Sequence, residues 1–251
     1  MAEARLRLAR AWRKLRAPLL PGDAAPAANE LPLRAELLSA AQMDRHGKLL
    51  AQAHEVRRMA APDRLLGRLA ENEAALISTC NLLIAATAAN RRIGPSGEWL
   101  LDNFYLIEEQ IRTAKRHLPE NYSTQLPQLQ SGPSAGRPRV YDIALQAISH
   151  GDGRVDAESL GRFITAYQSV TPLKLGELWA VPIMLRLALI ENLRRIGTRI
   201  IEDRIDRNQA DAWADRLTEV AESDPRHLVL VIADMVRSTP PASSSFVAEF
   251  A

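Results

Sequence analysis

Residues 150–163, HGDGRVDAESLGRF, contain the glycines and aspartates from which a calcium-binding loop is built. Counted from Asp152, such a loop requires an oxygen ligand at its third position, Gly at its sixth and Glu at its twelfth. The sequence has Arg154, Ala157 and Phe163 at these positions. No alternating strand precedes the glycines, as a dinucleotide-binding turn would require. The stretch is therefore predicted to be a turn between two helices.

A second candidate for chemistry is the pair Glu108 and Glu109, which follows Trp99, Phe104 and Tyr105 in one helical pattern. Carboxylates beside aromatic rings are typical of sites that cleave sugars. Adjacent residues of a helix, however, point about 100° apart, so these two carboxylates cannot face one glycosidic bond. A structural role is favoured for both.

The remaining metal-binding and nucleophilic residue types have the wrong spacing for a site. Asp203 and Asp206 lie three apart in a helical pattern, unlike the loop acids that hold the metal of a nucleotide sugar. His46 and His54 are eight apart, the other histidines are scattered, and Cys80 lies in an apolar helix. Serine nucleophile elbows and phosphate-cradling loops are absent from the sequence. We therefore expect no self-contained active site, no catalytic residue, no metal and no cofactor in this chain.

The composition is that of a globular helical protein. The 251 residues are 47% hydrophobic and 25% charged, and only 5% are aromatic, which favours helices over strands. The net charge of +2 gives no reason to expect a nucleic-acid partner. A single cysteine excludes an internal disulfide and suits a reducing compartment.

The longest helical pattern runs from Thr171 to Arg204. Thr171 is a predicted N-cap, and Pro172 suits the first helical position. Pro182 lies inside the pattern and predicts a kink or a break. One face is expected to be buried because apolar residues recur at steps of three and four: Leu178, Val181, Leu185, Leu189, Leu193, Ile196 and Ile200.

Charged residues collect at the far end of this helix. Glu191 and Arg195 have opposite charges at a spacing of four, which favours an ion pair, whereas Arg195 and Arg199 have like charges. The pattern is typical of a core helix with a solvated polar face.

The other segments also predict helices and no strand of useful length. The fold class is an all-α irregular multi-helix bundle with a long kinked central helix. Domains are predicted at 1–32, a basic segment with a flexible linker, and at 33–237, a helical domain with a candidate sub-boundary at the irregular loop 119–139. A Ser/Pro-rich tail at 238–251 is expected to be truncated. Further helices are predicted in 33–90 with a break at Pro62, from Glu98 to about Leu118, at 141–150, 156–167, 209–222 and 225–237.

No stretch predicts a membrane span or a signal peptide. Residues 74–90 are uncharged but too short and too polar to cross a bilayer, and 178–190 contains Arg186. Residues 1–16 form a basic amphipathic pattern that suits peripheral contact with an anionic membrane surface. The alternative for this segment is a solvated terminus without a partner.

Three blocks carry a family resemblance: GEWLLDNFYLIEEQIRTAKRHLPENYSTQLPQL (97–129), PRVYDIALQAISHGDGRVDAESLGRFITAYQ (138–168) and TPLKLGELWAVPIMLRLALIENLRRIG (171–197). They resemble the N-terminal region of bacterial cyclic β-1,2-glucan synthases, and residues 35–54 and 63–76 are similar too. The resemblance covers most of residues 31–251.

The resemblance implies a large parent protein in the inner membrane that uses UDP-glucose as donor, with a divalent cation. This region would be a non-catalytic scaffold at the cytoplasmic face, with the downstream transferase and phosphorylase-like domains of the same chain as partners. The polar end of the long helix, 194–204, is a candidate contact with those domains.

Two other functions are left open by the residues. The chain is a candidate glucan-binding module, with the 119–139 loop as a lid and stacking residues Trp99, Tyr105, Tyr122, Tyr141 and Trp179. It is also a candidate stand-alone interaction module that docks at a membrane through residues 1–16.

Overall fold

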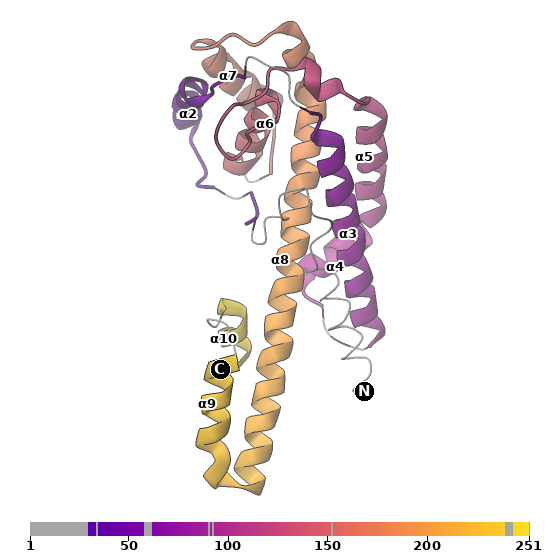
Figure 1. Cartoon of the computed structure of the whole chain (residues 1–251), viewed down its shortest axis with the longest axis vertical. Coiled ribbons are helices and arrows are strands. Elements are labelled where there is room, and N and C mark those ends of the chain that lie inside the picture. Colours follow the sequence, from indigo (N-terminus) through magenta and orange to yellow (C-terminus); the bar gives the residue numbers. More distant parts are fainter. Residues whose placement is uncertain are drawn as a thin grey trace. The chain divides into compact units, whose positions relative to one another are not determined.

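A computed structural model describes residues 30–33, 35–57, 62–89, 91, 93–151, 153–238 and 243–250. This described part contains α-helices, two short 3-10 helices and two isolated β-bridges but no strand, which confirms the all-α fold class (Figure 1). Residues 1–16 and most of the predicted linker lie outside it, and the domain division stays a prediction. The helices are α2 (Ala40–Ala53), α3 (Leu65–Ala88), α4 (Pro95–Asp102), α5 (Phe104–His117), η1 (Tyr122–Gln125), α6 (Arg139–His150), α7 (Ala157–Gln168), α8 (Leu175–Ser223), η2 (Pro225–His227), α9 (Leu228–Ser238) and α10 (Ser244–Phe250).

The central helix α8 is longer than its sequence pattern predicts. It has 49 residues, and the separate helix predicted at 209–222 is wrong because no Gly or Pro interrupts the chain between Arg204 and Gln209. The helix also continues through Pro182, so the alternative of a break does not occur. Pro182 is exposed, and the backbone group that it leaves unpaired can be hydrated by solvent.

The predicted cap of α8 is wrong as well. The N-cap is Lys174, whose backbone N–H donates to Oε2 of Glu177 at 2.9 Å. Thr171 instead directs its hydroxyl to the backbone carbonyl of Ala51, at 3.4 Å. The helix therefore begins three residues after Pro172, where a carboxylate of the first turn satisfies the free amide.

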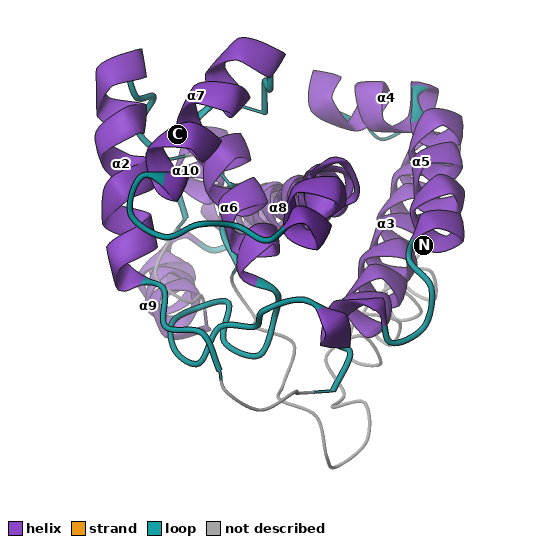
Figure 2. Cartoon of the chain, turned by 90° about the horizontal axis from the view of Figure 1, so that it is seen from above, coloured by secondary structure: helices purple, strands orange, loops and turns teal. Residues whose placement is uncertain are grey.

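Helices pack around α8 on more than one face. It contacts α6 on one face and α3, α4 and α5 on another, with α9 and α10 against its C-terminal part (Figures 1 and 2). The buried surface is therefore wider than one stripe. Leu189 of the predicted stripe is 38% exposed, whereas positions outside that stripe are fully buried: Ala180, Met184, Ala188 and Glu191.

A second layer is formed by α2 and α7, which pack on each other, and side chains of α6 join their core. Phe163 and Tyr167 of α7 are completely buried there, together with Ile143 of α6. Close approach of α2 to α7 depends on Gly47. A Cβ at this position would lie 3.0 Å from the carbonyl oxygen of Phe163.

We expect Gly47→Val to lower the free energy of unfolding by about 1–3 kcal/mol, because an added side chain overpacks this seam. Urea unfolding of the chain measures the change. The matched control is Gly161→Ala on α7, where a Cβ would meet nothing within 4 Å. That variant should gain about 0.4–1 kcal/mol from reduced unfolded-state entropy. Equal effects of the two substitutions would refute close packing as the role of Gly47.

The irregular segment 119–139 is fixed by backbone bonds. The amide of Gln130 donates to the carbonyl of Glu55 at 2.7 Å, and the amide of Arg57 donates to Gln128 at 2.8 Å. Gly136 has φ of 75°, a conformation that favours glycine. Leu129 is only 3% exposed. The segment is thus packed against residues 55–57 in this structure.

Candidate functional site

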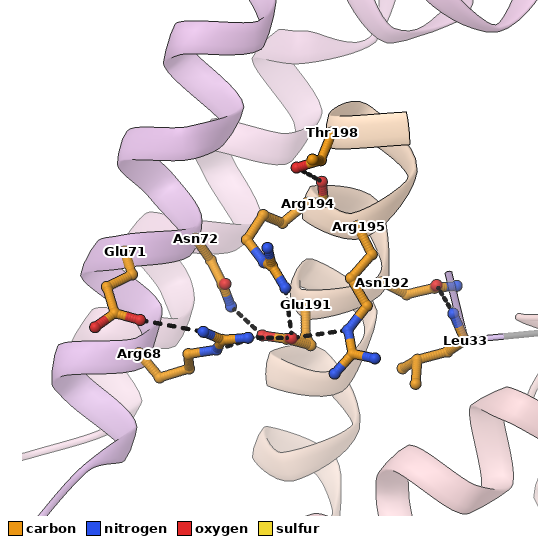
Figure 3. Close-up of polar contacts among 9 residues, drawn as sticks. All are labelled: Leu33, Arg68, Glu71, Asn72, Glu191, Asn192, Arg194, Arg195 and Thr198. Carbon is orange, nitrogen blue, oxygen red and sulfur yellow. Dashed lines mark hydrogen bonds and ion pairs between the residues drawn. The ribbon is translucent and has the colours of Figure 1, made fainter. Parts of the chain in front are cut away.

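A buried polar cluster surrounds Glu191 of α8 (Figure 3), and the Glu191 side chain is fully buried. The guanidinium of Arg68 on α3 binds both carboxylate oxygens: Nε donates to Oε2 at 2.9 Å and Nη2 to Oε1 at 2.6 Å. The amide of Asn72, one helical turn along α3, donates to Oε2 at 2.9 Å. One carboxylate therefore connects two helices through a bidentate pair and a neutral donor.

Two more arginines reach Glu191 from α8 itself. Nε of Arg195 donates to Oε1 at 2.9 Å, which confirms the pair expected from the spacing of four residues. Nη2 of Arg194 donates to the same oxygen at 3.0 Å. Arg68 also bonds Glu71 at 3.2 Å, but the Glu71 side chain is 63% exposed. Three cations thus converge on one buried anion.

The surrounding arginines decide the charge state of Glu191. Burial raises the pKa of Glu191, but the hydrogen bond and the charge of Arg68, together with Arg194 and Arg195, outweigh burial and hold this pKa well below its usual range. A general acid or base works best with a pKa near the operating pH. Glu191 is therefore an anion at neutral pH, suited to holding helices together and unsuited to proton transfer near neutral pH.

A second buried ion pair anchors the start of α8. Arg139 of α6 donates from Nε and Nη2 to the two carboxylate oxygens of Glu177, at 2.6 and 2.8 Å. Its Nη2 also donates to the carbonyl of Pro172 at 2.9 Å. Arg139 is 4% exposed and Glu177 is fully buried. Burial lowers the pKa of Arg139, but hydrogen bonding and attraction to Glu177 outweigh this effect and raise it.

The third cluster contains the residue types of a catalytic triad. His54 contacts Asp142 through Nε2 at 3.1 Å and the Tyr167 hydroxyl through Nδ1 at 2.9 Å. The hydroxyl of Ser134 donates to the other oxygen of Asp142. In a triad the serine bonds the histidine, whereas here it bonds the carboxylate. Ser134 is 3% exposed and Tyr167 is fully buried, so substrate could not reach either. The cluster is structural.

The aromatic residues singled out from the sequence occupy different environments. Trp99, Tyr105 and Trp179 are 53%, 63% and 75% exposed, on α4, α5 and α8. Tyr122 is half-buried in η1. Tyr141 is only 1% exposed, and burial raises the pKa of its hydroxyl. A sugar cannot stack on a ring with no free face, so the structure does not support Tyr141 as a stacking residue.

Neither a metal centre nor a deep cavity stands out on the described surface. The residues that the structure describes include no group of three or more His, Cys, Asp or Glu side chains able to hold a metal ion. None of the described helices is long and apolar enough to cross a membrane. A groove of about 620 Å³ between α2 and α7 is lined by charged residues, among them Asp44, Lys48, Glu158 and Arg162.

Comparison with known proteins relates this chain to a glucan synthase. No family model matches the sequence. The chain is 34% identical over 188 residues to the cyclic beta-(1,2)-glucan synthase NdvB of Rhizobium meliloti (strain 1021). The match covers 75% of this chain but 6% of that relative. Over most of its length, therefore, this chain is homologous to one short region of a cyclic beta-(1,2)-glucan synthase.

Proposed function

We propose that this chain is a non-catalytic helical scaffold of a glucan synthase related to NdvB. The proposal rests on one observation: the buried carboxylates of this chain are held by arginines of the fold. Glu191 is surrounded by Arg68, Arg194 and Arg195, and Glu177 is closed off by Arg139, so both carboxylates serve helix packing. A region that supplies shape rather than chemistry needs such fixed contacts between its helices.

The remaining parts of the proposal come from the homology. The parent enzyme would transfer glucose from UDP-glucose, with a divalent cation, to a growing β-1,2-glucan. This region would pack against the transferase and phosphorylase-like domains of the same polypeptide, at the cytoplasmic face of the bacterial inner membrane. Residues 1–16, which are basic, would add a peripheral membrane contact.

The test is an incorporation assay with the purified chain. We expect no radioactive glucan above the blank when the chain is incubated with UDP-[¹⁴C]glucose and Mg²⁺ or Mn²⁺. Membranes that contain an intact homologous synthase serve as the positive control. Glucan made by the chain alone would overturn the assignment as a scaffold.

The exposed aromatic rings favour glucan binding as a second candidate function. Trp99 and Trp179 are both more than half exposed, and exposed indole rings are suitable platforms for sugar stacking. Titration with linear β-1,2-glucan should then change tryptophan fluorescence, and Trp179→Ala should reduce that change. Trp213, which contacts the guanidinium of Arg216, provides a matched control substitution. An unchanged spectrum at millimolar glucan excludes this function.

A further inference from the structure

The seam between α2 and its neighbours contains two histidines in direct contact. The His46 ring of α2 meets the His150 ring of α6 edge-on, with centroids 4.5 Å apart. Nε2 of His46 contacts Oε1 of Gln146 at 3.1 Å, and the ring stacks on Phe163 of α7 at 6.0 Å. His150 in turn contacts the carbonyl of Glu36, through Nδ1 at 2.8 Å. One imidazole therefore joins α2 to both α6 and α7.

This arrangement suits neutral imidazole better than imidazolium. If both rings were protonated, two positive charges would lie 4.5 Å apart in a half-buried seam. Burial lowers the pKa of His46, and its repulsion from His150 acts in the same direction; these effects outweigh the hydrogen bond with Gln146 and the attraction of Asp142.

Other charged groups lie near His150 on α2, on α7 and in the segment before α7. Asp44 on α2, Arg154 and Asp156 before α7, and Arg162 on α7 line a cavity of about 190 Å³ next to His150. Arg162 donates to Asp44 at 2.7 Å, so the nearest acid on α2 is already paired. Asp142 is a further acid, and its charge acts on His46.

The two ends of α2 differ in how they would respond to acid. At the C-terminal end of α2, His54 contacts the Asp142 carboxylate through Nε2 at 3.1 Å and the Tyr167 hydroxyl through Nδ1 at 2.9 Å, so this end is held by an acidic partner. In the middle of α2, a protonated His46 would lie against another histidine, His150. Acid should therefore weaken the N-terminal half of α2 first, with the His54 end acting as a hinge.

We propose that the His46–His150 contact is an acid-sensitive latch that releases the N-terminal half of α2 from α6 and α7. The sign follows from linkage: a base whose pKa is lowered by folding contributes stability that is lost as pH falls through its unfolded value, about 6.5. The latch is closed at neutral pH and opens as pH falls below that unfolded value. It is independent of any synthase activity.

Hydrogen exchange of the full chain, corrected for the intrinsic rate, tests the latch at pH 7.5 and 5.5. We expect the protection of amides 43–47 to fall at least tenfold at pH 5.5 relative to those of α3. The amides of residues 51–54 should lose less protection than those of residues 43–47. His46→Gln should remove this pH response and His150→Gln should reduce it, because His46 stays buried there, whereas His227→Gln at an exposed site should retain it.

Two results would overturn the latch. One is a pH response that persists in His46→Gln. The other is an equal loss of protection in α2, α3 and α8, because that pattern reports global acid unfolding. The comparison between helices is made within the wild-type chain, so it decides the matter even if a variant fails to fold.

Discussion

Replacing Glu191 by Gln should lower the free energy of unfolding by about 3–5 kcal/mol, because Arg68, Arg194 and Arg195 would lose the buried anion that they share. The substitution preserves shape and removes only charge. Urea unfolding at pH 7 measures the difference. Glu71→Gln is the matched control: it removes an exposed carboxylate from the same Arg68, and should cost no more than about 1 kcal/mol.

The same residue sets a pH dependence. Because the folded pKa of Glu191 is lowered, its contribution is present above the unfolded carboxyl pKa of about 4.3 and is lost as pH falls below that value. The stability difference between wild type and Glu191→Gln should therefore shrink between about pH 5 and pH 2. A difference that is independent of pH, or smaller than 1 kcal/mol at pH 7, would contradict the role given to Glu191.

Arg139→Met should have an effect of similar size, about 3–5 kcal/mol, because it leaves the fully buried carboxylate of Glu177 without its cation. Methionine keeps the apolar part of the side chain, so the loss reports the charge and its hydrogen bonds. The control is Arg162→Met: both Arg162 and its partner Asp44 are partly exposed, so this substitution should change the stability much less than Arg139→Met.

A double substitution separates pairing from burial. Arg139→Met combined with Glu177→Leu removes both charges, and should recover part of the stability lost in Arg139→Met alone. Calorimetry of the four proteins gives the coupling between the two residues. Additive losses would show that Arg139 and Glu177 stabilise α8 independently.

Local spacing predicted only part of the Glu191 cluster. The pair with Arg195 follows from a separation of four residues on one helix, and a pair of this kind can be recognised from the sequence alone. Arg68 is 123 residues from Glu191, and Arg139 is 38 residues from Glu177. Partners at these separations are chosen by helix packing, and no local pattern identifies them.

The errors in the fold prediction have similar causes. The apolar stripe of the predicted helix ends at Ile200, yet the loss of this pattern does not stop the helix, because no Gly or Pro follows between Arg204 and Gln209. The composition of 119–139 indicated an irregular segment correctly. It could not indicate the backbone bonds with Glu55 and Arg57, which depend on contacts distant in sequence.

Residue type also misplaced one candidate for binding. Tyr141 was grouped with Trp179 because both are aromatic, but one is 1% and the other 75% exposed. Tyr141 lies on α6, which packs along α8, and nearly the whole of α6 is buried. The exposure of an aromatic residue depends on how its helix packs. The residue type alone does not indicate it.

We propose that this region acts in a glucan synthase through its folded shape. The most direct measurement exchanges the matched region of NdvB for the corresponding residues of this chain and quantifies the cyclic β-1,2-glucan that cells produce. We predict that the exchanged protein makes glucan, and that Glu191→Gln reduces the product only in proportion to the fraction of folded protein. Complete loss of glucan from a Glu191→Gln protein that remains fully folded would contradict the claim, because it would assign chemistry to this residue.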